Sequence, residues 1–582
     1  MALLVAAGAG LGSLFDFEVM RAIADRLASD GNAATYDRVL HAANVICLRA
    51  IAIAMAAFGA TLLAWGPAVV RALPCSSTGT YVETLPKPGR KPLLVWTVTF
   101  LTLLLSVRLW YLDHEGWDES TFIIMASHVL QGHLPYLELL DLKPPGLFLA
   151  LAGVMSVFGE NLLAVRLFGA FCLLVSAVAG YAIAVRRTTP LIAGVSMAVF
   201  CVLTSEIEFQ QTLTEHLVLA LSMPAVWLLV ARRNRLWAAF VIGVLLSAAT
   251  LTRMNIAYVV LAVGGFYVWR SVRPRRDVPR AAVVAYGLGG VLPLGSLVLI
   301  YWLAGGLDVF VVSVFWAPLH YATSQLGMTA ALLDHIGYWM RCIREAAYIF
   351  VPATILVGAG LPAHGFNRGK AILRGDDGLL LLVLGATALS ILRGGAAFGH
   401  YLLQVLPLVV LIAAAGFATL RKQPRGALFF LGLSILIVGA ALGRFGDDSI
   451  RWVRNEVRAP ERLTSLQRAA NLIREDRCCG ETVYAPSKHL VYWYLNQSPP
   501  SAVVHPTALT RDAIIAPLVE YGYVPQDEQQ RVLEQEFDYI VMDSGHELTW
   551  FTPEHRQHLD AILREHFRPW KRSGELVIYK RQ

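Results

Sequence analysis

Long apolar runs alternate with short polar segments along most of the chain. We count about twelve such runs, each close to the ~20 residues that a helix needs to cross a bilayer. They begin around Val45, Leu93, Leu162, Pro190, Glu215, Leu236, Ile256, Ala281, Ala346, Gly378, Tyr401 and Gly426. The pattern predicts a mainly α-helical, polytopic membrane protein of about twelve transmembrane helices.

The composition supports this prediction. The chain has 582 residues, of which 56% are hydrophobic and 16% charged, and its mean hydropathy is +0.55. Soluble domains carry about 25% charged residues. The sequence contains no Walker A loop, no nucleophile-elbow serine and no HExxH, so no familiar ATPase, hydrolase or protease signature is present.

The net charge of +7 does not indicate nucleic acid, because the basic residues mark one membrane face. One set of alternate loops holds about twenty lysines and arginines, which the positive-inside rule assigns to the cytoplasm. The intervening loops hold five, which are Lys143, Arg253, Arg341, Arg344 and Arg393. This asymmetry predicts a multi-pass protein of the cytoplasmic (inner) membrane, with "DHEGWDES" and everything after Arg444 on the extracytoplasmic side.

The ends of the chain differ from its middle. Residues 1–44 begin with an apolar stretch too short for a confident span, which is expected to be either an interfacial helix or the result of a poorly chosen start codon. Residues 45–92 are expected to supply an extra N-terminal transmembrane helix and a cytoplasmic loop. Residues 93–443 form the main transmembrane domain, with a first outer loop at 113–146. Residues 444–582 are polar and predict a small extracytoplasmic α/β domain.

The predicted elements of this C-terminal part alternate between helix and strand. The expected helices cover 461–476, 525–537 and 553–567, and the expected strands cover 481–486, 538–543 and 574–581.

The first outer loop opens with four acids directly after an apolar run. Asp113 and Glu115 are expected to be hydrated caps of the span. Asp118 and Glu119 precede an amphipathic helix over residues 120–132, whose N-terminus Asp118 or Ser120 can cap.

A second helix is expected to begin at Pro144–Pro145, because proline is tolerated in the first turn of a helix. Lys143, directly before it, is the only basic residue of this acidic loop. It can form an ion pair with Asp141 or Glu138, or it can take part in the function of the protein.

Taken in order, these residues resemble the first outer loop and following span of GT-C type membrane glycosyltransferases. The similarity is to the protein mannosyltransferases (dolichyl-phosphate-mannose-protein mannosyltransferase-like) and to the aminoarabinose transferases of lipid A. It covers roughly residues 93–443. The matching positions are Asp118–Glu119, Gln131–Gly132, Pro135–Tyr136, Asp141, Lys143–Pro144–Pro145, Phe158–Gly159 and Arg166–Leu167, with two later stretches, "TLTEHLVLAL" and "GHYLLQVLPLVVLIAAAG".

The resemblance implies a GT-C fold and an enzyme that uses a sugar linked to a polyprenyl phosphate. The acidic dyad Asp118 and Glu119 would face the acceptor on the outer side, with Asp118 as the general base that takes the proton of an acceptor hydroxyl. One direct displacement inverts the anomeric centre. Glu215, the family's acid at the start of a span, would contact the acceptor or the sugar, unless it only caps that span.

Negative charge grows on the leaving phosphate, so cations near the outer interface should stabilise it. The candidates are Lys143, Arg166, Arg253, Arg393, His400 and Tyr401. Arg166 can instead snorkel from the end of its span. His400 and Tyr401 stand where the family often has Arg-Tyr, and Arg393 can supply the charge that position 400 lacks.

No recognisable metal constellation accompanies the dyad, so we expect transfer without a metal or other cofactor. The expected partners are the lipid-linked sugar donor, membrane lipids and a glycan, lipid or protein acceptor, and no nucleic acid. The sequence identifies neither the sugar nor the acceptor.

Two alternatives come from other classes of protein. A transporter or flippase of polyprenyl-linked glycans would carry ionisable residues within its spans, often with inverted repeats. Here the spans are nearly free of charge, and no two halves of the chain resemble each other. A receptor whose tail binds a partner would leave the ordered first loop unexplained.

Overall fold

The computed structural model describes the greater part of the chain. The described residues are 89–108, 115–204, 207–273, 278–324, 376–393, 399–420, 464–476, 482–510, 512–544 and 551–582. All of them belong to one compact unit, Pro86–Leu442 and Leu463–Gln582. Residues 1–44, the predicted spans beginning around Val45, Ala346 and Gly426, and Asp113 lie outside the described residues.

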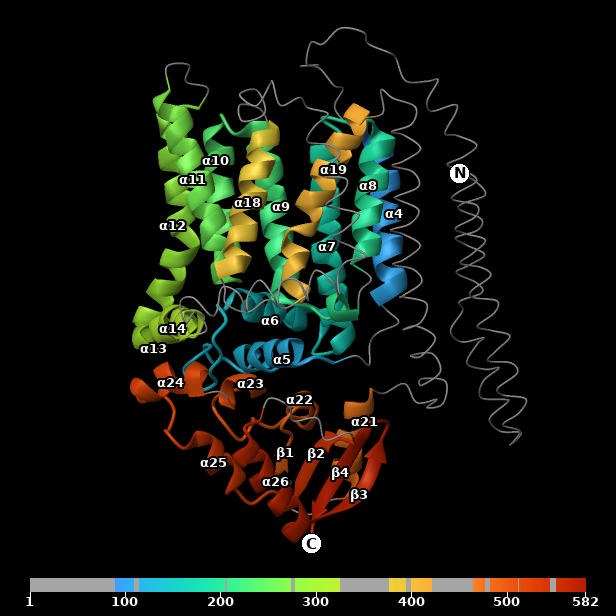
Figure 1. Ribbon diagram of the computed structural model, residues 1–582, viewed down its shortest axis with the longest axis vertical. Helices are drawn as coiled ribbons and strands as arrows, with labels where there is room; N and C mark the ends of the chain where they lie inside the picture. The colour runs from blue at the N-terminus through green and yellow to red at the C-terminus, as the bar shows by residue number, and fades with distance from the viewer. Residues whose placement is uncertain are drawn as a thin grey trace, which may run out of the picture. The chain divides into compact units, whose positions relative to one another are not determined.

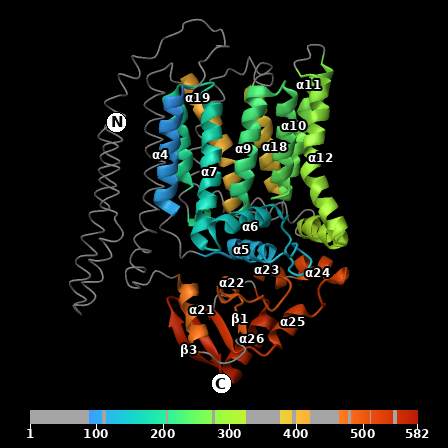
Figure 2. The same cartoon turned by 180° about the vertical axis from the view of Figure 1, so that it is seen from behind.

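A set of apolar helices runs side by side in both views of the molecule (Figures 1 and 2). They are α4 (Arg90–Arg108), α7 (Leu162–Ala184), α8 (Pro190–Leu203), α9 (Thr214–Arg232), α10 (Leu236–Thr250), α11 (Ala257–Val272), α12 (Arg280–Leu303), α18 (Asp376–Arg393) and α19 (Leu406–Leu420). Each corresponds to one of the predicted spans.

Within the described ranges, four segments are long and apolar enough to cross a membrane. They are Leu162–Ala184, Thr214–Arg232, Met254–Val272 and Arg280–Leu303. The chain is therefore a mainly helical, multi-pass membrane protein. The total of about twelve spans stays a prediction.

Local sequence signals set several helix starts. The Asn161 side chain caps α7 by accepting a hydrogen bond from the Ala164 N–H at 2.8 Å. Thr189 caps α8 in the same way, and Pro190 occupies the first helical position, where a missing N–H costs nothing. These polar caps stand in loops, which leaves the spans themselves apolar.

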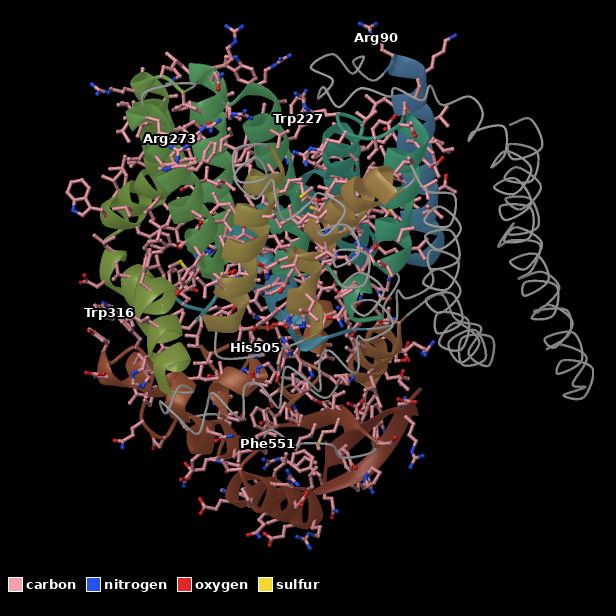
Figure 3. All side chains as sticks on the ribbon, turned by 45° about the horizontal axis from the view of Figure 1, so that its top comes forward. Arg90, Trp227, Arg273, Trp316, His505 and Phe551 are labelled. Atoms are coloured by element: carbon pink, nitrogen blue, oxygen red, sulfur yellow. The ribbon has the colours of Figure 1, made fainter. Side chains whose placement is uncertain are left out.

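Basic residues gather at one end of these helices. Arg90 and Arg273, labelled in Figure 3, lie at the end away from His505 of the C-terminal part. Both arginines belong to loops that the charge count predicts to be cytoplasmic.

Two shorter helices lie crosswise to the apolar helices, between their ends and the C-terminal part (Figures 1 and 2). They are α5 (Trp117–Leu130) and α6 (Gly146–Phe158), and both predicted helices of the first outer loop are confirmed. The predicted cap of α5 is wrong. Gly116 is the N-cap and no side chain caps it, because the helix begins at Trp117 and places Asp118 and Ser120 inside its first turn.

The C-terminal part contains a four-stranded sheet in the order β1-β2-β4-β3. Strand β1 (Val483–Tyr484) is parallel to β2 (Tyr539–Asp543), which is antiparallel to β4 (Leu576–Arg581), and β4 is antiparallel to β3 (Phe567–Ser573). The register pairs Val541 with Ile578. The accompanying helices are α21 (Ser465–Asp476), α22 (Leu490–Leu495), α23 (Pro506–Leu509), α24 (Asp512–Glu520), α25 (Glu528–Leu533) and α26 (Pro553–His566).

Strand β3 was not predicted, because its sequence FRPWKRS is polar and contains a proline. The structure explains the proline, since β3 is an edge strand whose register shifts between Pro569 and Lys571. Proline is confined to such positions because it cannot donate to a central ladder.

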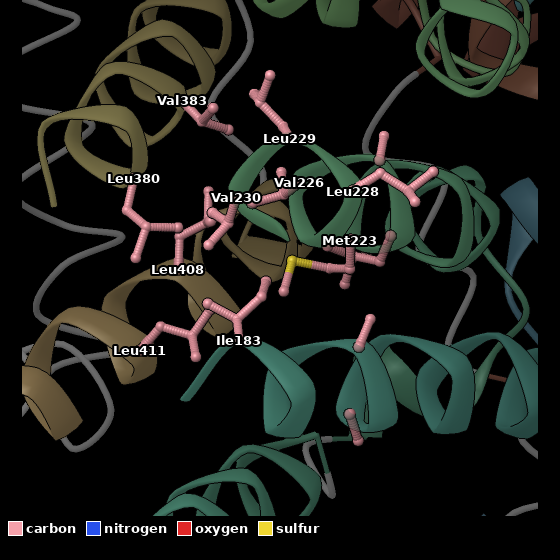
Figure 4. Close-up of a cluster of buried hydrophobic side chains, with 14 of the residues drawn as sticks. Ile183, Met223, Val226, Leu228, Leu229, Val230, Leu380, Val383, Leu408 and Leu411 are labelled. Carbon is pink, nitrogen blue, oxygen red and sulfur yellow. The ribbon is translucent and has the colours of Figure 1, made fainter. Parts of the chain in front are cut away.

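Three hydrophobic cores are found among the described residues, and the third, which contains Ile540 and Val577, lies within the C-terminal part. The first lies between the apolar helices, where Met223 of α9, Ile183 of α7 and Leu408 of α19 belong to one buried cluster (Figure 4). The second joins the crosswise helices to the C-terminal part, and it combines Phe122, Phe148, Val491, Val503 and Tyr539 in one buried cluster. The C-terminal part thus packs directly on the first outer loop.

A third group of short helices follows α12. It comprises α13 (Leu307–Val311), the π-helix η4 (Val312–Trp316) and α14 (Ala317–Ser324). Buried Val309 and Phe310 belong to the second core, so this group also packs against the loop and the C-terminal part.

Candidate active site

Asp118 stands where three segments of the chain meet. Its side chain is 27% exposed in the first turn of α5. The Lys143 ammonium donates a hydrogen bond to the Asp118 Oδ1 and lies over the Phe122 ring, 4.7 Å from its centroid. From the C-terminal part, the His505 Nε2 lies 3.2 Å from the same oxygen. The contact brings together residues 387 positions apart in the sequence.

The charge state of this group follows from its neighbours. Burial raises the pKa of the Asp118 carboxyl, but the Lys143 charge and the His505 hydrogen bond outweigh it and hold the pKa well below its usual range. Burial likewise lowers the pKa of Lys143, while Asp118 and Asp141 raise it, with a net rise. At neutral pH the two side chains therefore form an ion pair.

The main chain at Lys143 is held by Tyr136. The Tyr136 hydroxyl donates to the Lys143 carbonyl at 2.5 Å, and the Tyr301 hydroxyl donates to the Pro135 carbonyl at 2.9 Å. Tyr136 has φ 71, a left-handed conformation that is uncommon for a bulky residue. Its N–H donates to the Leu139 carbonyl at 2.9 Å, so the turn is fixed by hydrogen bonds. The Pro-Tyr pair of the loop thus positions the lysine.

A second ion pair lies beside the first. Arg253, which follows α10, donates to the Glu215 Oε1 and to the Thr214 hydroxyl, the latter at 3.0 Å. Its guanidinium lies over the Tyr401 ring, 3.9 Å from the centroid. Glu215 is 1% exposed and does not cap α9, whose N-cap is Leu213.

The short helix η6 (Gly399–Gln404) brings the next two candidates to this pair. The His400 Nε2 lies 3.9 Å from the Glu215 Oε1, and the His400 and Tyr401 rings meet edge to face at 4.8 Å. Asp118 interacts electrostatically with Arg253, His400 and Tyr401. The structure therefore brings Asp118, Lys143, Glu215, Arg253, His400 and Tyr401 into one site.

Glu119 and Arg166 lie apart from this site. Both side chains are 1% exposed and pair at 2.7 Å. Glu119 also accepts the Thr212 N–H at 2.6 Å, and Arg166 donates to the Gln210 carbonyl at 2.8 Å. Arg166 therefore does not snorkel, and the two predicted acids face different environments.

One further candidate remains to be placed. Arg393 is the last residue of α18, and its side chain is outside the described part of the chain. The neighbouring acid Glu138 does not pair with Lys143, because it contacts the His133 Nδ1 at 2.8 Å. The ion pair of Lys143 is with Asp118, and Asp141 contributes by raising the pKa of Lys143.

One cluster of the described residues could hold a metal ion. His128, His133 and Glu138 place one possible ligand atom each within 4.8 Å of one another. Burial and the neighbouring His133 lower the pKa of His128, which favours the neutral, ligating form. Neither Asp118 nor Glu119 belongs to this cluster.

Sequence reasoning missed two histidines of the C-terminal part. His505 contacts Asp118 as described, and the His489 Nε2 lies 3.0 Å from the Thr121 hydroxyl of α5. Burial, with the nearby His505, lowers the pKa of His489 to about 3, so this ring is neutral. The only local signal is the pair His505-Pro506, which is typical of a helix start and says nothing about Asp118.

Comparisons with known proteins agree with this architecture. Residues 142–302 match the family model of dolichyl-phosphate-mannose-protein mannosyltransferases. The segment includes Lys143, Arg166, Glu215 and Arg253. No curated protein matches the sequence.

Two solved structures of ArnT share the fold of this chain at low sequence identity. ArnT from Cupriavidus metallidurans bound to undecaprenyl phosphate is 14% identical, with a TM-score of 0.52 over 83% of this chain and 98% of ArnT. ArnT in the apo state is 13% identical, with a TM-score of 0.50 over 84% and 98% of the two chains. The oligosaccharyltransferase AglB from Archaeoglobus fulgidus, in complex with an inhibitory peptide and a dolichol-phosphate, is 10% identical, with a TM-score of 0.45 over 84% and 74%.

The comparisons define the fold and support the resemblance seen in the first outer loop. The chain has the fold of the GT-C membrane glycosyltransferases, and its resemblance to the mannosyltransferase-like family, inferred from the first loop, is confirmed.

Proposed function

We propose that this protein is a glycosyltransferase that moves a sugar from a polyprenyl-phosphate donor to an acceptor hydroxyl, with Asp118 as the general base. The observation that carries this proposal is the placement of Asp118, a partly exposed carboxylate that pairs with Lys143 and lies within electrostatic range of Arg253, at the ends of apolar helices. The family match and the fold of ArnT, which was solved with undecaprenyl phosphate, support a lipid-phosphate donor.

The reaction is a single displacement at the anomeric carbon. The acceptor oxygen forms the new bond to this carbon and gives its proton to the Asp118 carboxylate. The bond to the donor phosphate breaks, and its electron pair leaves with the phosphate. Attack from the face opposite the leaving group inverts the configuration, and a positioned base contributes about 10²–10⁴ in rate.

Lys143 and Arg253 would bind the donor phosphate. Each now pairs with a carboxylate, Asp118 and Glu215 respectively, so a phosphate would compete with these carboxylates for the cations. When Lys143 turns to the phosphate, Asp118 loses the charge that lowers its pKa and becomes a stronger base. Donor binding would thus activate the base.

The remaining candidate residues fall into two groups, those near Lys143 and Arg253 and the buried pair of Glu119 and Arg166. His400, Tyr401 and Arg393 would complete the phosphate site, and Glu215 would contact the sugar or the acceptor once Arg253 engages the phosphate. Glu119 and Arg166 are assigned a positioning role, because their buried pair ties α5 to α7. Neither needs to touch the phosphate.

The membrane arrangement follows the loop charges. The complete chain would have about twelve spans, with 93–443 as the catalytic transmembrane domain. The active site and residues 444–582 would lie outside the cytoplasmic membrane, opposite the loops that carry most of the lysines and arginines.

The experiment is a transfer assay with the purified full chain in liposomes. Polyprenyl-phosphate-linked pentoses, hexoses and amino sugars would serve as donors and a cell-envelope extract as the acceptor. We expect one donor class to release free polyprenyl phosphate and to give a product of opposite anomeric configuration by NMR. Movement of intact donor across the bilayer without release would instead identify a transporter, and a retained configuration would exclude the single displacement.

A further inference from the structure

The C-terminal part is fastened to the loop that carries Lys143. The Leu140 N–H donates to the Ala502 carbonyl at 2.6 Å, and the Val504 N–H donates to the Leu140 carbonyl at 3.1 Å. These bonds form a parallel bridge between Leu140 and Val503. The bridge fixes the main chain directly before His505, three residues from Lys143 on the loop side.

Two contacts from α22 also join the C-terminal part to residues next to α5 and α6. The Tyr494 hydroxyl donates to the Glu115 Oε1 at 3.2 Å, and the Trp493 Nε1–H donates to the Glu160 Oε2 at 3.2 Å. With the shared hydrophobic core, these bonds make the C-terminal part a wall of the candidate site.

The hydrogen bonds of His505 define which ring nitrogen carries the proton. His505 caps α23, and its Nδ1 accepts the Thr507 N–H at 3.3 Å. Pro506 has no N–H, so Thr507 supplies the first main-chain donor of this helix. Because Nδ1 accepts, the proton of the neutral ring lies on Nε2, and His505 donates it to the Asp118 Oδ1 at 3.2 Å.

Both hydrogen bonds to Asp118 end on one oxygen. Lys143 and His505 each donate to Oδ1, and among the described residues no hydrogen bond to Oδ2 is found. This geometry sets the rotation of the carboxylate and leaves Oδ2 to accept a proton. The contact also survives the proposed move of Lys143 to the phosphate, because His505 is anchored by its own helix.

We propose that the C-terminal part completes the catalytic site and that His505 is a positioning residue that orients Asp118. The proposal rests on the glycosyltransferase function proposed above. It gives the C-terminal part a direct role, because a chain in which this part is not docked lacks one of the two donors that orient the base.

The test compares His505→Ala, His505→Gln and His505→Asn in the full chain. A hydrogen bond to a charged group accounts for about a ten- to hundredfold change in rate, so we expect His505→Ala to lose this much kcat while KM for the donor stays unchanged. Gln carries an amide N–H near the position of Nε2 and should recover part of the activity, whereas the shorter Asn should not. His558→Ala, an exposed histidine on α26, is the matched control.

The pH profile separates positioning from a merely structural role. The groups that interact with Asp118 are Lys143, His505, His400, Arg253, Tyr401 and His489. A hydrogen bond to the ionised form lowers the pKa of a carboxyl, so its loss in His505→Ala should move the acid limb of kcat/KM to higher pH. His505→Gln should move it less.

A readout independent of activity measures the contact itself. Thermal unfolding of Asp118→Ala, His505→Ala and the double variant gives a double-mutant cycle, in which we expect the two changes to be non-additive; alanine is used at position 118 because asparagine could still accept the His505 hydrogen bond. Additive unfolding together with full activity of His505→Ala would overturn the proposal, while an inactive Asp118→Ala in the same series would leave the transferase function intact. Coupling without any transfer by the wild-type chain would instead overturn the function and with it the positioning role of His505.

Discussion

Two consecutive carboxylates of α5 occupy opposite environments. Asp118 is 27% exposed and contacts Lys143 and His505, whereas Glu119 is 1% exposed and contacts Arg166 and the Thr212 N–H. Neighbouring side chains of a helix with 3.6 residues per turn point about 100° apart, which is enough to separate the site from the interior. One acidic pair in the sequence is thus two different groups in the structure.

The difference determines what each ion pair can do. A partly exposed pair contributes only about 0–1 kcal/mol to stability, so Lys143 and Asp118 can exchange partners at little cost. Removing one member of a buried pair destabilises a protein by about 3–5 kcal/mol, because the other charge is left without compensation. The first pair suits a reaction site, and the second suits a fixed joint between α5 and α7.

The largest expected effect is that of Asp118→Asn. It removes the general base and should lower kcat by about 10²–10⁴ while the melting temperature stays near that of the wild type. The measurement is the release of polyprenyl phosphate, with size-exclusion chromatography to check folding. A fully active Asp118→Asn protein would remove the mechanism.

Glu119→Gln should act on stability rather than on chemistry. It leaves the buried Arg166 charge uncompensated, and we expect a loss of about 3–5 kcal/mol, seen as a lower melting temperature and yield. The double variant Glu119→Gln/Arg166→Met replaces the charge by an apolar side chain and should recover part of that stability. A stable but inactive Glu119→Gln would instead put Glu119 in the catalytic dyad, as the family resemblance implies.

Much of the membrane part could be predicted from the sequence, because span length and apolar composition determine it locally. The starts at Leu162, Pro190 and Leu236 agree with α7, α8 and α10. The family resemblance led to Asp118 and Lys143 through the order of residues in one loop. These features depend on neighbouring positions along the chain.

The missed features depend on contacts between distant segments. No local pattern separates Asp118 from Glu119, since only the packing of α5 on Arg166 and on the C-terminal part decides which carboxylate is buried. The sequence does not indicate the contact of His505 with Asp118 for the same reason, because 387 residues separate the two. The cap of α5 was misplaced because Gly116 carries no side-chain signal.

Lys143→Met tests the ion pair of Asp118 through the pH dependence of transfer. In the free protein the Lys143 charge lowers the pKa of Asp118 against the effect of burial, so its removal should raise that pKa and move the acid limb of kcat/KM to higher pH. For the wild type, the acid limb of kcat should lie above that of kcat/KM, because kcat reports the donor complex, in which Lys143 has turned away.

The same variant tests the phosphate contact. We expect KM for the donor to rise about tenfold, with a smaller change for the acceptor, while Lys143→Arg keeps the charge and most of the donor use. A change confined to the acceptor would mean that Lys143 does not bind the phosphate.

The smallest expected effect is that of EDTA on transfer. Protein cations and N–H groups already engage both acids, Asp118 through Lys143 and Glu119 through Arg166, so neither carboxylate needs a metal to offset its charge. We expect full activity after chelation. A loss that Mn²⁺ or Mg²⁺ restores would contradict metal-independent transfer, and repeating the assay with His133→Ala would locate the metal. If the variant no longer responds to EDTA, the metal belongs to the cluster of His128, His133 and Glu138, and if it still responds, the metal acts outside that cluster.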